Sequence, residues 1–347
     1  MKFRLAHWPW VLLLCVAVMH AAAQVAPSPD APPQGPAGDP NQDDQQPLET
    51  LKVNVNLVSL YFTVHDKHGA LIPHLTKDDF TILEDKTQQT IKNFTAENDQ
   101  PLTLGILLDT SGSQQNVLPL EQQAGSAFLA HVLRSKDEAF LISFDVNLDL
   151  LSDYTNNAHA LARAMNQAQI NVGTGGMGGM PSGTPKGTLL YDAVYSATHE
   201  KLQQETGRKA IIILTDGEDQ GSTQKLQGAI ESAQKSNTIV YPILIADRAM
   251  YLAAGEIYMG SSAMQALAEQ TGGRVINVGN NGRKLEDAFD QIQDELRTQY
   301  LASYTPINKD ADGKFRKVEL DCGKGVKVQA RKGYYAIVGA GDDANIE

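Results

Sequence analysis

The sequence predicts an α/β protein: a doubly wound, mostly parallel sheet, accompanied by a smaller antiparallel β domain built from the N- and C-terminal flanks. Two runs in the middle of the chain, Leu102–Leu108 and Ala210–Leu214, are almost wholly apolar, which is typical of strands that are buried on both faces. Between residues 101 and 297, strand-like and helix-like segments alternate, a pattern that favours a mostly parallel sheet. Short strands separated by turns lie on either side of that region, and we expect them to form the antiparallel domain.

The N-terminus has the layout of a secretory signal peptide. Lys2 and Arg4 precede the apolar run Trp8–Met19, and Ala21–Ala23 offers a cleavage site made of small residues. The apolar run is shorter than the ~20 residues that a helix needs to span a bilayer. We therefore expect residues 1–23 to be removed, leaving an exported protein, periplasmic or secreted, without a membrane span.

The charge of the chain is strongly acidic. The full sequence has a net charge of −12, and without Lys2 and Arg4 it has 27 basic and 41 acidic residues, a net charge of −14. An acidic surface repels phosphate backbones and offers no polybasic patch to anionic lipid, so nucleic-acid binding is excluded as a function. Cleavage would leave Cys322 as the single cysteine, so no intramolecular disulfide is expected.

The first part of the mature chain changes character near residue 51. Residues 24–50 are rich in Pro, Gln, Asp and Gly, and we expect a disordered, Pro-rich linker there. Alternating apolar residues then predict three strands, over 53–64, 80–83 and 91–94. A β segment of this size, residues 51–98, is too small to be stable by itself.

The central region, residues 101–297, begins with the buried strand 102–108. Its pattern then predicts helix 118–132, strand 140–144 with a hairpin partner at 148–151, helix 158–168, a glycine-rich loop, and helix 189–202. The second half predicts strand 210–214, helix 223–235, strand 239–245, helix 263–271, strand 274–278 and helix 284–297.

Short strands return after residue 297. They are predicted over 300–304, 316–320 and 326–330, with turns at 308–313 and 322–325. We expect the C-terminal β segment, residues 299–338, to pair with residues 51–98, because neither flank has enough apolar core alone. Residues 339–347 are predicted to be a tail.

Side chains that carry oxygen follow the two buried strands. Asp109, Ser111 and Ser113 come directly after the first strand, Asp216 follows the second, and Thr188 precedes a predicted helix at the end of the glycine-rich loop. Because ligands of an open parallel sheet bind beyond the carboxyl ends of its strands, we expect these side chains to converge. Two carboxylates and three hydroxyls suit a hard cation such as Mg²⁺, or Mn²⁺ or Ca²⁺, better than Zn²⁺.

In this pattern the sequence resembles the von Willebrand factor A (VWA) domain family. The metal-ion-dependent adhesion site (MIDAS) of that family reads Asp-x-Ser-x-Ser, then a Thr, then the Asp of a Thr-Asp-Gly turn. The five candidate residues fill these positions in this order. The resemblance covers about residues 101–297 and implies a Rossmann-like fold with a MIDAS. The flanks, at 75–80 and 331–335, resemble an acidobacterial group of exported VWA-related proteins.

The resemblance also implies a function. In the family, hydroxyls bind the ion directly and carboxylates act mostly through water, which leaves the cation electrophilic. Such a cation favours the carboxylate of an Asp or Glu on a partner protein. The resemblance therefore implies cell adhesion or protein–protein interaction through a metal ion, and we expect no enzymatic activity.

Two other functions stay open. The chain could be a structural component of envelope assembly in which the metal is only structural. It could also be an aspartic protease that uses Asp109, because apolar residues precede Asp109-Thr110 as they precede that family's Asp-Thr-Gly. However, Ser111 stands where the protease needs Gly, and the sequence has no second Asp-Thr-Gly or Asp-Ser-Gly to share a proton.

Other acidic residues of the central region are interpreted more simply. Glu218 and Asp219, which follow Asp216, are predicted to form a solvated acidic turn. Asp145 and Asp153 are predicted to be turn residues of a hairpin.

Overall fold

The computed structural model describes residues 57–96, 100–171, 187–246, 260–323 and 325–337. The predicted signal peptide (1–23), the linker (24–50), most of the glycine-rich loop and the tail (339–347) lie outside these residues. Among the helices that the structure describes, none combines the length and the apolar character needed to cross a bilayer.

A six-stranded sheet forms the central domain, with the strand order β10-β9-β8-β5-β6-β7. Its strands are β5 (Leu102–Asp109), β6 (Glu138–Phe144), β7 (Leu148–Thr155), β8 (Arg208–Thr215), β9 (Thr238–Leu244) and β10 (Ile276–Asn277). All neighbouring pairs of these six strands are parallel except β6 and β7, which form the predicted antiparallel hairpin. The mostly parallel sheet predicted from the sequence is confirmed.

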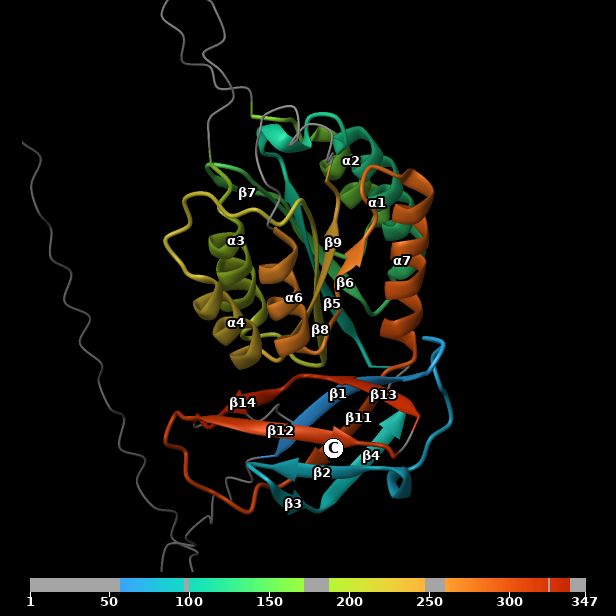
Figure 1. Ribbon diagram of the computed structural model, residues 1–347. Helices are drawn as coiled ribbons and strands as arrows, with labels where there is room; N and C mark the ends of the chain where they lie inside the picture. Colours follow the sequence, from blue (N-terminus) through green and yellow to red (C-terminus); the bar gives the residue numbers. More distant parts are fainter. Residues whose placement is uncertain (1–56, 97–99, 172–186, 247–259, 324, 338–347) are drawn as a thin grey trace, which may run out of the picture. The chain divides into compact units, whose positions relative to one another are not determined.

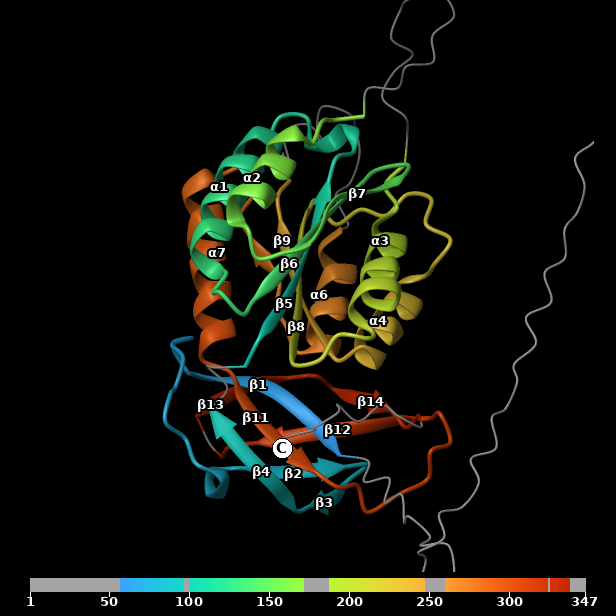
Figure 2. The ribbon, with the colours of Figure 1, turned by 180° about the vertical axis from the view of Figure 1, so that it is seen from behind.

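Helices cover both faces of this sheet (Figures 1 and 2). One face packs against α1 (Leu118–Val132), α2 (Ala158–Gln167) and α7 (Gly282–Arg297), and the other against α3 (Leu190–Ser196), α4 (Leu226–Lys235) and α6 (Gly260–Thr271). Strand β8 shows how the sequence supports two layers. Ile212 and Leu214 belong to the core on the α1 side, whereas Ile211 and Ile213 belong to the core on the α3 side. Burial on both faces explains why β5 and β8 are almost continuously apolar.

Two four-stranded antiparallel sheets form the second domain. Their strand orders are β13-β1-β11-β4 and β14-β12-β2-β3. The N-terminal flank supplies β1 (Val58–Asp66), β2 (Thr81–Glu84), β3 (Thr87–Gln89) and β4 (Ile91–Ala96), and the C-terminal flank supplies β11 (Tyr300–Tyr304), β12 (Phe315–Asp321), β13 (Val326–Ala330) and β14 (Gly333–Tyr335). Because β1 pairs with both β11 and β13, and β2 pairs with β12, the predicted β domain built from both flanks is confirmed.

The core of this β domain is rich in aromatic rings. Phe62 stacks on Tyr300 with the ring centroids 5.5 Å apart, and Phe80 meets Phe62 edge-on at 5.1 Å. The buried carboxylate of Glu84 accepts hydrogen bonds from the hydroxyls of Tyr304 and Tyr334, at 2.7 and 2.9 Å. These bonds join residues that are 220 and 250 positions apart, so both flanks contribute to one buried polar network.

Several element boundaries differ from the sequence prediction. The predicted helix over 189–202 is α-helical only to Ser196 and continues as a π-helical segment, η3 (Ala197–Leu202). Helix α4 begins at Leu226 rather than near residue 223, because the backbone of Lys225 is extended. Just before the helix, the carboxylate of Asp192 accepts hydrogen bonds from the backbone N–H groups of Thr223 and Gln224, at 2.8 and 2.7 Å. Strands β3 and β14 have three residues each, too few for an alternating pattern to indicate them.

Polar contacts hold the last turn of α7 in place. The Arg208 guanidinium, at the start of β8, donates to the carbonyl oxygen of Gln100, just before β5, and to that of Leu296 in α7. Glu295 of α7 is only 1% exposed; it forms an ion pair with Arg274 and accepts a hydrogen bond from the Gln329 amide of β13 at 2.9 Å. These contacts tie the last turn of α7 to both parts of the fold.

Candidate metal site

The candidate site lies where the strand order of the central sheet reverses. From β5 the chain proceeds to β6 and β7 on one side, and it then returns to β8, β9 and β10 on the other side. Ligands of open α/β sheets bind beyond the carboxyl ends of the strands at such a switch point. Asp109 is the last residue of β5, and Asp216 directly follows β8, so both residues lie at this point.

Asp109 is fully buried and is held by neutral donors. Its Oδ1 accepts a hydrogen bond from the backbone N–H of Ser111 at 2.9 Å, and its Oδ2 accepts one from the hydroxyl of Thr215 at 2.6 Å. Burial raises the pKa of Asp109 to about 7; the negative charge of Asp216 adds to the rise, whereas the hydrogen bonds from Ser111 and Thr215 oppose it. Since Asp216 is itself only 2% exposed, the site contains two buried carboxylates that repel each other.

The two serines of the motif form one connected group with Asp109. The hydroxyls of Ser111 and Ser113 are 3.0 Å apart, and the backbone N–H of Ser111 hydrogen-bonds to Asp109. A short 3₁₀ turn, η2 (Gly112–Gln114), follows Ser111 and contains Ser113, and it is held by the hydrogen bond from the Gln114 N–H to the Ser111 carbonyl. The turn thus brings two hydroxyls to the carboxylate at the end of β5.

Thr188 is held between two neighbouring loops. Its backbone N–H donates to the carbonyl of Gln220 at 2.9 Å, and its carbonyl accepts from the Gln220 N–H at 2.9 Å. The next N–H, that of Leu189, donates to the carbonyl of Asp145 at 2.8 Å, and the Asp145 carboxylate accepts from the Thr110 hydroxyl at 3.0 Å. The backbone at Thr188 is therefore fixed to the loop after β8 and, through Asp145, to the loop after β5.

Three polar residues contribute more to this region than the sequence indicated. Thr215 binds Asp109 directly, whereas the sequence indicates it only as the Thr of the Thr-Asp-Gly turn. Asp145 does lie in the hairpin turn, where its carboxylate accepts a hydrogen bond from the Asn147 N–H at 3.0 Å. However, Asp145 is only 6% exposed, and its carboxylate also binds Thr110 of the Asp-x-Ser-x-Ser loop. Asp219 is not simply a solvated turn residue, because its carboxylate accepts hydrogen bonds from the N–H of Tyr191, in the first turn of α3, and from a serine hydroxyl.

The chemistry of the five candidate side chains is that of an oxygen-only site. Three of the five are hydroxyls, so the site differs from metal centres made of acidic, histidine or cysteine side chains. Within the described ranges of the chain, no group of three or more His, Cys, Asp or Glu side chains is arranged to hold a metal ion.

The Asp-x-Ser-x-Ser loop and the Thr-Asp-Gly turn thus meet at the switch point of a doubly wound, mostly parallel sheet that is covered by helices on both faces. The central domain has the doubly wound fold that the resemblance to VWA domains implies. This central domain is inserted between the two β flanks, since β4 ends at Ala96 and β11 begins at Tyr300.

Comparisons with known proteins give distant similarities. No protein-family model matches the chain. Calcium-activated chloride channel regulator 1 of Bos taurus is 24% identical over 193 residues, a stretch that makes up 54% of this chain but only 18% of that protein. The chain therefore matches less than a fifth of the length of this curated relative.

Solved structures also resemble part of the chain. The conserved hypothetical protein BatB from Bacteroides thetaiotaomicron gives a TM-score of 0.41 with 19% identity, over 56% of this chain and 98% of that chain. Proximal thread matrix protein 1 from the mussel byssus, in a structure with a zinc-occupied MIDAS motif, gives a TM-score of 0.45 with 13% identity, over 61% of this chain and 49% of that chain. These similarities concern the fold of the VWA-like part.

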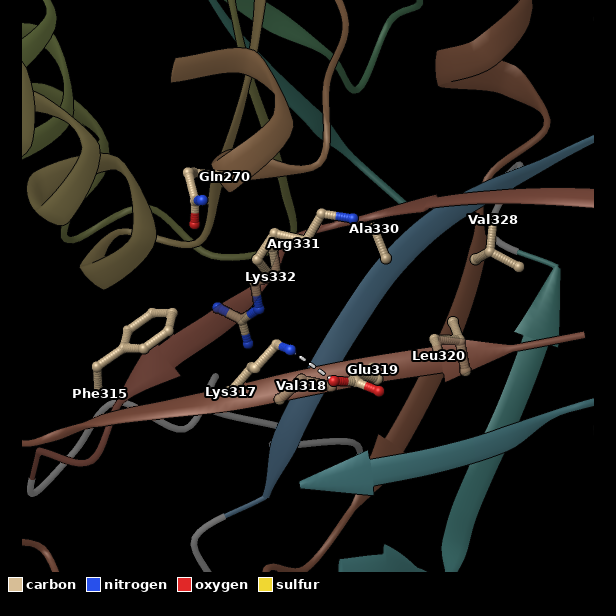
Figure 3. Close-up of a pocket in the computed structure, with 10 residues that line it drawn as sticks. All are labelled: Gln270, Phe315, Lys317, Val318, Glu319, Leu320, Val328, Ala330, Arg331 and Lys332. Carbon is tan, nitrogen blue, oxygen red and sulfur yellow. Dashed lines mark ion pairs between the residues drawn. The ribbon is translucent and has the colours of Figure 1, made fainter. Parts of the chain in front are cut away.

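A separate pocket of about 630 Å³ lies at the β domain. Figure 3 shows Gln270 of α6 on one side of it and Phe315, Lys317 and Glu319 of β12 on the other, with Lys317 and Glu319 paired at 2.6 Å. None of the five candidate residues lines this pocket. The pocket is therefore distinct from the candidate metal site.

Proposed function

We propose that this protein is an exported interaction module that binds one divalent cation through Asp109, Ser111, Ser113, Thr188 and Asp216. Through that cation it would hold a carboxylate of a partner protein. The observation that carries the proposal is the pair of buried carboxylates, Asp109 and Asp216, at the switch point of the sheet. Two like charges in a buried site are unfavourable unless a cation or a proton neutralises one of them.

The donor set fits a hard divalent cation. Hydroxyl and carboxylate oxygens are the ligands that Mg²⁺, Mn²⁺ and Ca²⁺ prefer, and we propose Mg²⁺ as the ion bound. The mussel thread protein holds zinc in its MIDAS motif in one structure, so Zn²⁺ belongs in any comparison of ions. A bound cation would supply Lewis acidity toward a carboxylate oxygen. The residues of this chain would hold the ion and neutralise its charge.

The net charge of the chain makes the cation necessary for an acidic partner. A protein with a net charge of −14 after removal of residues 1–23 repels an acidic partner, and screening at ~0.15 M salt removes only the part beyond about 8 Å. A divalent cation would cancel the charge of the two site carboxylates and would offer a coordination position to a partner carboxylate at the edge of the sheet. Export is part of the proposal, and sequencing the N-terminus of the mature protein would reveal whether residues 1–23 are removed.

Metal binding is tested by calorimetry on the chain without residues 1–23. We expect one Mg²⁺ or Mn²⁺ per chain, and we expect Asp109→Ala to abolish binding because it removes a carboxylate of the site. Asp153→Ala is the matched control, since Asp153 pairs with Lys201 and its side chain is 66% exposed. Asp145 would be a poor control because it binds Thr110 of the motif loop. An equal loss of metal affinity in the Asp109 and Asp153 variants would contradict the assignment of Asp109 to the metal site.

Partner binding is tested with immobilised peptides that carry a central Asp or Glu, beside matched peptides with Asn or Gln. We expect the acidic peptides to bind in Mg²⁺, to be released by EDTA and to bind again when Mg²⁺ is restored. Thr188→Ala should lower the free energy of peptide binding by more than it lowers the free energy of unfolding. Binding that survives both EDTA and Asp109→Ala would mean that the adhesion mechanism has to be abandoned.

The same experiment separates the alternatives. A structural metal site would bind the ion, and the acidic and amide peptides would then bind equally weakly. An aspartic protease would cleave peptides in the presence of EDTA and would lose this activity in Asp109→Ala.

A further inference from the structure

Two fully buried polar side chains near the candidate site lack hydrogen-bond partners. Glu121 and Gln114 are both 0% exposed. Within the part of the chain that the structure describes, neither carboxylate oxygen of Glu121 and neither amide atom of Gln114 has a hydrogen-bond partner. Buried polar groups in folded proteins are normally paired, so such a concentration of unpaired atoms indicates a place where water or an ion binds.

Both residues belong to the segment that follows the Asp-x-Ser-x-Ser motif. Gln114 comes directly after Ser113 and ends the η2 turn. Glu121 lies in the first turn of α1, where its backbone N–H donates to the Val117 carbonyl at 3.1 Å. Their backbones are thus fixed by the same turn and helix that fix the motif serines.

Glu121 lies within electrostatic reach of both carboxylates of the site. Burial raises the pKa of Glu121, and the charges of Asp109 and then Asp216 add to the rise. An acidic residue in the first turn of a helix ordinarily stabilises the helix dipole from an exposed position, and this role does not require the burial seen here. The other buried residues of α1 are apolar or glycine: Leu118, Ala124, Gly125, Phe128, Leu129 and Val132.

We propose that Glu121, assisted by the amide of Gln114, supports the cation site without binding the ion directly, and that both side chains bind the hydration water of the cation. This inference rests on the proposed function. It accounts for the four unpaired atoms, because water in a polar cavity satisfies two to four buried groups. It also favours Mg²⁺, which keeps several of its waters when a protein binds it.

The test uses Glu121→Gln in the chain without residues 1–23, with Mn²⁺ and Mg²⁺ as the probes. This substitution keeps the shape of the side chain and removes its charge. Calorimetry should show an affinity about 10- to 100-fold lower, the range found when groups that support metal ligands are removed. The melting temperature of the metal-free protein should stay the same or rise, because the substitution removes a repulsion from Asp109 and Asp216. If Glu121 had only a structural role, its substitution would not lower the metal affinity while keeping or raising the melting temperature.

Glu84→Gln is the matched control. Glu84 is also a buried glutamate, at 3% exposure, but its carboxylate binds Tyr304 and Tyr334 in the β domain, so this variant should keep the wild-type metal affinity. Glu121→Asp, which keeps the charge on a shorter side chain, should give an affinity between those of Glu121→Gln and the wild type.

The outcomes distinguish the two proposals. If Glu121→Gln binds Mn²⁺ and Mg²⁺ as tightly as the wild type does, the role of Glu121 is overturned and the proposed function stands. If the wild-type chain binds neither ion, the proposed function itself fails, and the inference fails with it.

Discussion

Thr215 connects the two strand ends that form the candidate site. Its hydroxyl donates to Oδ2 of Asp109 at 2.6 Å and accepts a hydrogen bond from the N–H of Gly217 at 3.0 Å. The residue is completely buried. One hydroxyl therefore orients the carboxylate at the end of β5 and also holds the turn in which Asp216 lies.

Replacing Thr215 by valine keeps the shape of the side chain but leaves two buried groups without a partner. Since each such group costs about 1–3 kcal/mol, we expect the free energy of unfolding of the metal-free protein to fall by about 2 kcal/mol or more. The affinity for Mg²⁺ should fall too, because the Asp109 carboxylate loses a donor that orients it. Urea unfolding and calorimetry measure the two effects.

Thr63→Val provides the comparison for that variant. Thr63 of β1 is 1% exposed, and its hydroxyl lies 3.0 Å from Nε2 of His65 in the β domain. This change should lower stability and leave metal affinity unchanged. Wild-type metal affinity in Thr215→Val would show that the hydroxyl has no part in the site.

The turn after β8 depends on a glycine. Gly217 has φ +86°, a left-handed conformation that residues with a Cβ rarely adopt, and a Cβ at this position would lie 2.8 Å from the carbonyl oxygen of Gly260, the first residue of α6. The turn and the start of α6 are therefore in close contact, and this contact determines the path of the backbone just after Asp216.

Gly217→Ala separates the steric contact from the backbone conformation when it is compared with Gly313→Ala. Gly313 has φ +72°, but a Cβ added there would have no other atom within 4 Å, so alanine at 313 should cost only the conformational penalty, about 1 kcal/mol. Alanine at 217 should cost at least about 2 kcal/mol, since overpacking adds about 1–3 kcal/mol. Thermal unfolding in EDTA measures both. Equal destabilisation of the two variants would argue against a close contact with α6.

At the scale of the whole molecule, the ends of the chain depend on each other. Strand β1 of the N-terminal flank is paired on both sides by strands of the C-terminal flank, β11 and β13. The central domain is inserted between the two flanks. This arrangement predicts that the flanks unfold together and that neither one persists without the other.

Deleting residues 299–347 should therefore expose residues 58–96 to limited proteolysis while residues 102–297 stay resistant, because β1 and β2 lose all their C-terminal partners. Deleting only residues 339–347 is the control and should leave both regions resistant. The cleavage sites are identified by mass spectrometry. Full protection of residues 58–96 in the longer deletion would mean that the N-terminal flank folds alone.

The contact between α7 and the β domain gives a second prediction at this scale. Glu295→Ala removes the partner of Arg274 and of Gln329, and breaking a buried ion pair costs about 3–5 kcal/mol. We expect the free energy of unfolding to fall by about 3 kcal/mol, the lower end of that range, because the Arg274 side chain is 31% exposed. Differential scanning calorimetry should show this loss. Glu231→Ala breaks a pair with Lys235 in which both side chains are 37% exposed, and it should cost about 0.5 kcal/mol or less.

Much of the fold could be predicted from the sequence because the relevant patterns are local. The apolar runs of β5 and β8 indicate burial on both faces, and helix α1 has the bounds that its periodicity predicts, 118–132. The five candidate residues could be named because each follows a strand or precedes a helix in a recognisable motif. The structure places Asp109 and Asp216 at the switch point, while their binding of a cation stays a prediction.

The sequence by itself determined the alternation of strands and helices, the β character of both flanks and the oxygen-rich loops, since hydrophobic period and turn residues act over a few positions. Only the tertiary structure decided which strands are neighbours, and therefore that β1 lies between β11 and β13. It also decided the burial of Glu121, which looks like an ordinary first-turn acid in the sequence but lies fully buried near Asp109 and Asp216. The physical reason is that burial and charge repulsion depend on contacts between segments far apart in the chain, which a local sequence pattern does not indicate.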